Sequence, residues 1–198
     1  MEGKVFPMWK IFYRALLLFL SLTVLTGVGY PLVVTGLAQL CFPNQSNGSL
    51  IRSQDKTIGS ALIGQDFQSA KYFHGRPSAA HYDALASGGT NLAPTNQQLV
   101  KTVAGRILRL RQENGLPDKF PVPGDLVTAS ASGLDPDISP ESALLQVPRI
   151  AKARSLPVAV IRRLVRKQTE YPLLRLFGAS RVNVLQINLA LDALKNGG

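Results

Sequence analysis

The N-terminal part of the chain is almost entirely apolar, whereas apolar and polar positions alternate in everything that follows. No charged residue occurs between Ala15 and Ile51. The uncharged, mainly apolar stretch at residues 15–40 is longer than the roughly 20 residues that cross the hydrocarbon core of a bilayer as a helix. Because backbone N–H and C=O groups find no partners in lipid, such a stretch must be helical. The pattern therefore predicts one transmembrane helix over residues 15–40.

Glycine and proline residues divide this helix, and small residues near its end suggest an alternative. Gly27, Gly29 and Pro31 fall inside the helix, where they weaken or kink it. The segment Gly36-Leu37-Ala38 has small residues where a signal peptidase acts, which is typical of a cleaved signal peptide. However, the apolar core of a signal peptide is usually roughly 7–15 residues long. The length of the stretch favours a permanent anchor.

The rest of the sequence predicts one soluble α+β domain over residues 56–198, after a polar, turn-rich linker over residues 41–55. Short aliphatic runs predict strands at residues 60–63 and 126–128. Helical periodicity and capping signals predict three to four helices. Their expected starts are Thr95 (with Gln98 as a capping box), Ser139, Pro157 and Asn183; Gly115 is expected to end the first, and Pro148 to interrupt the second.

Charge predicts the topology. Lys4, Lys10 and Arg14 lie before the apolar stretch. Basic residues that flank a first transmembrane helix stay in the cytoplasm, while a long following domain translocates whatever its charge. We therefore expect residues 1–14 in the cytoplasm and residues 56–198 outside it.

The soluble part is itself basic, with 19 Lys and Arg against 11 Asp and Glu in residues 52–198. This excess fits an acidic face of another protein and anionic lipid head groups equally well. The basic residues have few aromatic residues between them, and the domain is expected outside the cytoplasm. Both points argue against nucleic acid as a partner.

Candidate chemical groups do not assemble into a recognisable catalytic or metal site. His74, His81 and Asp83 lack a Cys or Glu that would complete a tetrahedral metal site. The segment Ser87-Gly88-Gly89-Thr90-Asn91 can aim backbone N–H groups at an anion, but no G-x-x-x-x-G-K-[ST] motif is present. Turn chemistry favours a structural role for it. We expect no catalytic residue and no bound metal.

Long and unusual loop sequences resemble one family. They occur at residues 72–78 (YFHGRPS), 87–92 (SGGTNL, with Thr95-Asn96), 125–136 (DLVTASASGLDP), 146–151 (QVPRIA) and 182–192 (VNVLQINLALD). Together with the N-terminal helix they look like the C subunit of the Kdp potassium-transporting ATPases. The similarity covers essentially the whole chain.

The resemblance implies a non-catalytic accessory subunit of a complex in the bacterial inner membrane that imports K⁺ at the expense of ATP. In that family the A subunit carries the ion pathway, and the B subunit is the ATP-hydrolysing P-type ATPase. The C subunit is described as raising the affinity of the B subunit for ATP. The Ser-Gly-Gly motif, here Ser87-Gly88-Gly89-Thr90, has been likened to the signature of ABC transporters. ATP is implied as a ligand only by this resemblance.

The expected topology conflicts with direct contact between this domain and ATP, because a domain outside the membrane cannot reach cytoplasmic ATP. We therefore expect the domain to cap and stabilise the A subunit. The residues expected at a partner or nucleotide contact are Gly75, Arg76, Ser87, Gly88, Gly89, Thr90 and Asn91. An alternative of a different class is a membrane-tethered extracytoplasmic binding module for an anionic ligand.

Overall fold

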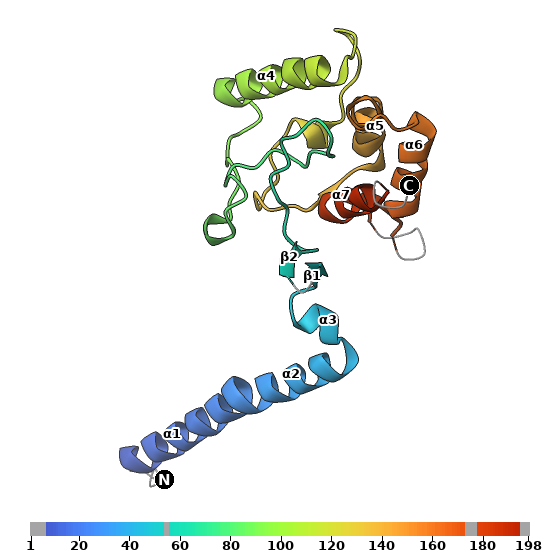
Figure 1. Ribbon diagram of the computed structural model, residues 1–198. Helices are drawn as coiled ribbons and strands as arrows, with labels where there is room; N and C mark the ends of the chain where they lie inside the picture. Colours follow the sequence, from blue (N-terminus) through green and yellow to red (C-terminus); the bar gives the residue numbers. More distant parts are fainter. Residues whose placement is uncertain (1–6, 54–55, 173–177, 195–198) are drawn as a thin grey trace. The chain divides into compact units, whose positions relative to one another are not determined.

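The computed structural model describes residues 7–53, 56–172 and 178–194. Residues 1–6 of the expected cytoplasmic segment and residues 54–55 of the expected linker lie outside this range. The chain divides into two compact units, which meet between Leu50 and Ile51. The predicted fold class is confirmed: a long apolar N-terminal helix precedes a domain of helices and small sheets (Figure 1).

The N-terminal unit is built from one long helical segment. It comprises α1 (Met8–Val24), a π-helical turn η1 (Leu25–Gly29) and α2 (Tyr30–Cys41), and the short helix α3 (Pro43–Ser46) follows. The segment Met8–Cys41 is long and apolar enough to cross a membrane, and its most apolar window has no buried residue. The π turn ends two residues before Pro31, whose ring would clash with the carbonyl of Gly27 in a regular α-helix. The predicted weak point is therefore a local widening of the helix.

In its described residues, the second unit contains two small sheets and four longer helices. Strands β1 (Leu50–Ser53) and β2 (Lys56–Ser60) form one sheet. Strands β3 (Asp137–Ile138), β5 (Arg181–Asn183) and β4 (Thr169–Glu170) form an antiparallel sheet with β5 in the centre. The helices are α4 (Gln97–Asn114), α5 (Pro140–Arg154), α6 (Val158–Gln168) and α7 (Val184–Ala193). The 3₁₀ turns η2 (Ala84–Ala86) and η3 (Gly124–Leu126) lie in the long loops.

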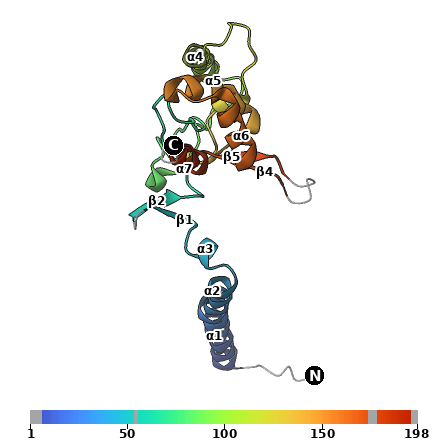
Figure 2. The same cartoon turned by 45° about the vertical axis from the view of Figure 1, so that its right-hand side comes forward.

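The core lies between α5, α6, α7 and strand β5, which Figure 2 shows beside α6 and α7. Ile150, Ile161 and Ile187 are fully buried there, one from each helix. Phe73 enters the same core from the long loop before α4 and is also fully buried. The loop is therefore part of the core and not a surface excursion.

Both predicted strands are wrong. Strand β2 ends at Ser60, and residues 61–63 form a turn in which the Ser60 hydroxyl accepts a hydrogen bond from the N–H of Leu62. Leu126 ends the 3₁₀ turn η3, and Val127 and Thr128 follow it, their N–H groups donating to the C=O of Gly124. In both places local turn chemistry outweighs a short aliphatic run.

Most predicted helix ends are confirmed, and two are wrong. Ser139 and Asn183 cap α5 and α7, Pro157 precedes α6, and Gly115 ends α4 in a left-handed conformation. Helix α4 is capped by Asn96, whose side chain accepts from the N–H of Gln98, and not by Thr95. Pro148 does not interrupt α5, which continues through it to Arg154. Pro148 and Leu144, the residue whose C=O loses its helical partner, are both exposed, so water can satisfy that group.

Candidate functional site

Two buried side-chain amides bind the backbone of the loop at residues 72–78, the first of the loop sequences that carry the family resemblance. Asn188 of α7 accepts from the N–H of Phe73 at 2.8 Å and donates to its C=O at 2.9 Å. Gln146 of α5 does the same for His74, at 2.8 Å and 3.1 Å. Both amides are 1% exposed. They supply the partners that a neighbouring strand would otherwise give to this buried backbone.

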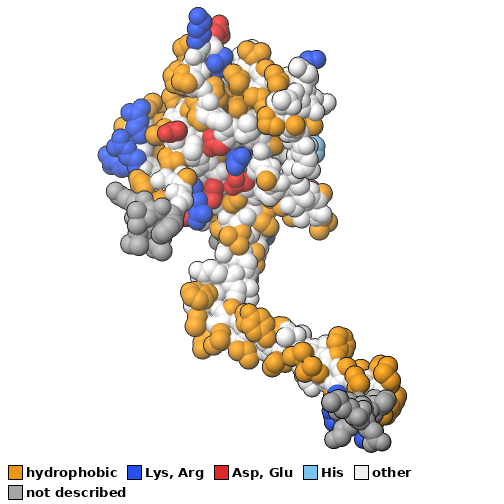
Figure 3. Space-filling model, turned by 180° about the vertical axis from the view of Figure 1, so that it is seen from behind, with side chains coloured by type: hydrophobic (Ala, Val, Ile, Leu, Met, Phe, Trp, Pro, Cys, Tyr) orange, Lys and Arg blue, Asp and Glu red, His pale blue; other side chains and the backbone are white. Residues whose placement is uncertain are grey.

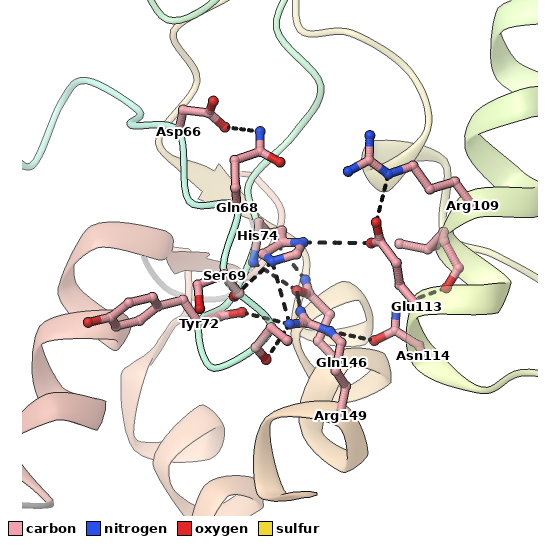
Figure 4. Close-up of polar contacts among 12 residues, drawn as sticks. Asp66, Gln68, Ser69, Tyr72, His74, Arg109, Glu113, Asn114, Gln146 and Arg149 are labelled. Atoms are coloured by element: carbon pink, nitrogen blue, oxygen red, sulfur yellow. Dashed lines mark hydrogen bonds and ion pairs between the residues drawn. The ribbon is translucent and has the colours of Figure 1, made fainter. Parts of the chain in front are cut away.

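Arg149 of α5 lies at the centre of the contacts around this loop (Figure 4). Its guanidinium donates to the C=O groups of Ala70 at 2.6 Å and Tyr72 at 3.1 Å. It also donates to the side chains of Asn114 at 3.1 Å and Gln146 at 2.7 Å. Burial lowers the pKa of Arg149, but a guanidinium remains a cation. This side chain therefore joins the loop, α4 and α5 through a single charged group.

His74 is held between Ser69 and Glu113. Its Nε2 lies 3.1 Å from the C=O of Ser69 and 3.5 Å from a guanidinium nitrogen of Arg149; the shorter contact favours the tautomer with the proton on Nε2. Its Nδ1 lies 3.9 Å from a carboxylate oxygen of Glu113. Burial, followed by the positive charge of Arg149, lowers the pKa of His74 below its ordinary value of 6.5. The imidazole is therefore neutral at pH 7.

Gly75 and Arg76 lie where this loop meets two others. The guanidinium of Arg76 forms an ion pair with Asp135 at 2.9 Å, with each side chain a little over a quarter exposed. The hydroxyl of Tyr82 donates to the C=O of Arg76. A Cβ on Gly75 would lie 2.8 Å from that hydroxyl oxygen, so the contact requires glycine. Burial, more than the nearby carboxylates, raises the pKa of Tyr82 to about 12, which keeps the phenol protonated as a donor.

The 87–91 loop is locked onto the segment 131–133. The hydroxyl of Ser87 and the N–H of Gly88 both donate to the C=O of Ser132, at 3.0 Å and 2.9 Å. Gly89 packs against Ala131, whose C=O would lie 3.0 Å from a Cβ at residue 89. Two donors that an anion would need are therefore engaged within the domain, whereas Thr90 and Asn91 are exposed.

Gly75 and Arg76 also line a hollow of about 330 Å³ that the 87–91 loop does not reach. Across it, Arg109 pairs with Glu113 at 2.6 Å, and Arg106 donates to the C=O of Val127 at 3.0 Å. Burial lowers the pKa of Arg106. The remaining lining residues are Asp66, Phe67, Gln68, His74, Pro77, Ser78, His81, Tyr82, Leu110 and Leu126. Most of the charge in the hollow is thus already paired.

The predicted site residues therefore form two groups. Gly75 and Arg76 belong to the hollow, and residues 87–91 form a separate loop. The segment 131–135 connects them, because Asp135 pairs with Arg76 and Ser132 accepts from the 87–88 backbone and side chain. Of the three candidate metal ligands, only His74 and His81 line the hollow, while Asp83 caps η2. The part of the chain that the structure describes contains no cluster of three or more His, Cys, Asp or Glu side chains suited to a metal.

Sequence reasoning missed the residues that organise the site: Tyr82, Gln146, Arg149 and Asn188. Asn188 did give a signal. It falls three residues after Leu185 and three before Leu191, on the face that packs into the core, where an unexplained amide indicates a buried hydrogen-bonded partner. Arg149 gave none, because three of its four acceptors (the C=O groups of Ala70 and Tyr72 and the side chain of Asn114) are far away in the sequence.

Comparison with known proteins places the chain in a family. The family described as "K+-transporting ATPase, c chain" matches residues 12–193. The chain is 54% identical over 191 residues to the potassium-transporting ATPase KdpC subunit of Polaromonas naphthalenivorans, covering 95% of this chain and 97% of the relative. It is 52% identical over 188 residues to that of Rhodopseudomonas palustris strain TIE-1 (88% and 92% covered), and 57% identical over 173 residues to that of Acidobacterium capsulatum (86% and 91% covered). The chain therefore belongs to the KdpC family of potassium-transporting ATPase subunits.

Proposed function

We propose that this chain is a non-catalytic accessory subunit of an ATP-driven K⁺ uptake complex. Its N-terminus is cytoplasmic, its helix spans the bacterial inner membrane, and its α+β domain lies on the extracytoplasmic side. There the domain caps and stabilises the K⁺-translocating A subunit, so that any effect on ATP binding by the ATP-hydrolysing B subunit is indirect. Family membership over residues 12–193 is the observation that carries this proposal.

The geometry around the Ser-Gly-Gly segment supports an indirect role toward ATP. A phosphate-binding loop offers free backbone N–H groups and hydroxyls to the ligand. Here the Ser87 hydroxyl and the Gly88 N–H are both used by Ser132. The segment precedes α4 by several residues, and the N-terminus of α4 is capped by Asn96. These contacts favour a rigid protein-binding loop over a nucleotide cradle.

The exposed part of that loop is a suitable partner contact. Thr90 and Asn91 are exposed, and their loop is held by hydrogen bonds from Ser87 and Gly88 to the C=O of Ser132. The ion pair between Arg76 and Asp135 links the same supporting segment, residues 131–135, to the hollow. A preorganised surface loses little conformational entropy on association. We assign Gly75, Arg76 and the 87–91 loop to the subunit contact on this basis.

Site-directed cross-linking in the intact complex tests the contact. In a Cys41→Ser background, which removes the only cysteine of the chain, Thr90→Cys or Asn91→Cys is coupled to a photo-activated maleimide. Both should cross-link to the large multi-span subunit, whereas Lys152→Cys on the exposed face of α5 should not. Equal cross-linking from all three positions would overturn the assignment.

The side of the membrane is tested on intact cells. In the same Cys41→Ser background, the Thr102→Cys variant, on the exposed face of α4, is treated with a membrane-impermeant maleimide after the outer envelope is permeabilised. Labelling is expected without lysis of the inner membrane. Labelling that requires lysis would place the domain in the cytoplasm.

A second candidate function is a tethered binding module for an anionic ligand. It is favoured by the hollow beside Arg76 and Arg106, since the Nε of Arg76 is buried without a hydrogen-bond partner among the described residues. Calorimetric titration of the purified full-length chain with ATP or inorganic phosphate tests it. Two results together would favour this function over that of an accessory subunit. They are saturable binding that the Arg106→Gln substitution removes, and purification of the chain without multi-span partners.

A further inference from the structure

Four basic side chains cover the outer face of α6. Arg162, Arg163, Arg166 and Lys167 are exposed, while Ile161, Leu164 and Val165 on the other side of the helix are buried in the core. Figure 3 shows Lys and Arg side chains gathered over α6 at the left of the view. We call these four residues the α6 basic face.

The α6 basic face has no carboxylate partner within ion-pair distance in the described part of the chain. Other arginines of the domain do: Arg76, Arg109, Arg154 and Arg181 each pair with an acidic side chain. The face is thus a concentration of positive charge that the domain does not neutralise within ion-pair distance.

Helix stability does not explain the α6 basic face. Residues four apart on a helix are neighbours, so the pairs Arg162–Arg166 and Arg163–Lys167 repel each other. Arg166 and Lys167 lie in the last turn, where the helix dipole favours positive charge. Arg162 and Arg163 lie further from that end and gain little from the dipole. Their placement therefore points to a ligand outside the domain.

Exposed apolar groups flank the α6 basic face. Val158 and Val160 at the start of α6 are 40% and 38% exposed. Tyr171, just beyond the end of the helix and of β4, is 60% exposed. Basic residues bordered by aliphatic and aromatic side chains are typical of surfaces that bind at the membrane interface. This combination favours a membrane surface as the ligand.

We propose that the α6 basic face binds anionic phospholipid head groups of the bilayer that holds the Met8–Cys41 helix. Residues 42–49 separate α2 from β1 and span at most about 3.5 Å each, which confines the domain near that bilayer. A tether of this kind raises the effective concentration of lipid at the domain. The inference rests on the membrane anchor and not on the proposed A-subunit contact, and it holds for either side of the membrane.

The test uses the purified full-length chain in vesicles without any partner subunit. In the Cys41→Ser background, Ala159→Cys on the exposed side of α6 carries a fluorophore, and a lipid-head-group quencher reports its distance from the membrane. Thr102→Cys on α4 is the reference position. Vesicles contain phosphatidylcholine alone, or an equimolar mixture with phosphatidylglycerol. The fluorophore at position 159 should be strongly quenched in the mixture and not in phosphatidylcholine alone, and the fluorophore at position 102 should be quenched in neither. About 0.5 M salt should reverse the quenching by screening the charges.

Charge-matched variants separate this face from the overall charge of the domain. One basic residue near an anionic leaflet strengthens binding roughly fivefold. The variant R162Q/R163Q/R166Q/K167Q should therefore lose the quenching, with the docked-to-free ratio falling at least about a hundredfold. The control K56Q/K101Q/K119Q/K152Q removes the same charge from exposed lysines elsewhere and should retain it.

Three outcomes would overturn the proposal. They are equal quenching in phosphatidylcholine alone, equal loss in the two charge-matched variants, and, in a parallel experiment with the A and B subunits added, shielding of the α6 face that is absent without them. The last outcome would identify an acidic protein face as the ligand. Circular dichroism of both variants confirms that each keeps its helices. Failure of this test leaves the cross-links from Thr90→Cys unaffected, so the two proposals fail independently.

Discussion

The two loops that carry the strongest family sequences are held in opposite ways. In the loop at residues 72–76, Phe73 enters the core, and side chains from α5 and α7 bind the backbone of residues 72–74. Residues 87–91 stay at the surface, where a neighbouring loop supports them through Ser132. The first arrangement stabilises the domain, and the second presents an exposed surface in a fixed shape. The two loops therefore differ in structural role: one contributes to the core, and the other forms a supported, exposed surface.

The largest effect should come from Asn188, which binds both backbone groups of Phe73. Asn188→Leu leaves a buried N–H and a buried C=O without partners, so we expect a loss of about 2–5 kcal/mol in the free energy of unfolding. Urea titration of the full-length chain in detergent, followed by circular dichroism, measures it. Gln112→Leu, which replaces an exposed amide on α4, should change stability by no more than about 0.5 kcal/mol. Similar losses in the two variants would show that the buried amide does not hold the loop.

A smaller loss should come from the turn beneath the 87–91 loop. Gly133 has φ +68°, and a Cβ there would lie 2.8 Å from the C=O of Gly88 and 2.8 Å from the Cβ of Ala80. Gly133→Ala should therefore cost about 1–3 kcal/mol through backbone strain and displacement of the loop. Gly105→Ala is the control, because nothing lies within 4 Å of a Cβ at that position in α4. It should stabilise the domain by about 0.5–1 kcal/mol, and a loss there would undermine the steric explanation.

Helix ends were the most predictable part of the fold. Ser139 and Asn183 bind N–H groups three residues away, and such local contacts can be read directly from sequence. The strands were not predictable. β3, β4 and β5 have only two or three residues each, which is too short for a period of two to be seen. Their pairing depends on the packing of α5, α6 and α7, which no local pattern contains.

The site was predictable only in part, for the same reason. The resemblance pointed to Gly75, Arg76 and the 87–91 loop, and their loop sequences marked them. Their partners lie far away in the chain: Asp135 is 59 residues from Arg76, and Ser132 is 45 residues from Ser87. A hydrogen bond between two irregular loops leaves no periodic signal in either sequence. The structure was needed to show that Arg76 and the 87–91 loop share one supporting segment.

Acidification should destabilise the loop at residues 72–76, which contains His74, and should leave the loop at residues 87–91 unaffected. Burial lowers the pKa of His74 in the folded domain below 6.5, so the unfolded chain binds a proton more readily. The stability contribution of neutral His74 is thus fully present above pH 6.5 and is lost as the pH falls through the folded pKa. His74→Gln keeps a donor toward Ser69 without a titrating group, and its stability should fall less than that of the parent chain below pH 6.5. Denaturation titrations of both chains at pH 7.5 and lower compare the two; parallel curves would exclude His74 as the cause.

The smallest effect on stability, and the most selective effect on assembly, should come from Ser87. The hydrogen bond from its hydroxyl to the C=O of Ser132 is exposed, so Ser87→Ala should lower the free energy of unfolding by no more than about 0.5–1 kcal/mol. If the 87–91 loop binds the A subunit, loosening it should still reduce the yield of co-purified complex, because the loop must then be ordered on association. Gly105→Ala provides the assembly control, since it lies on α4 and leaves the loop unchanged. Ser87→Ala complexes that form in parental yield, with parental cross-linking from Asn91→Cys, would show that the serine braces a turn and contributes nothing to the subunit contact.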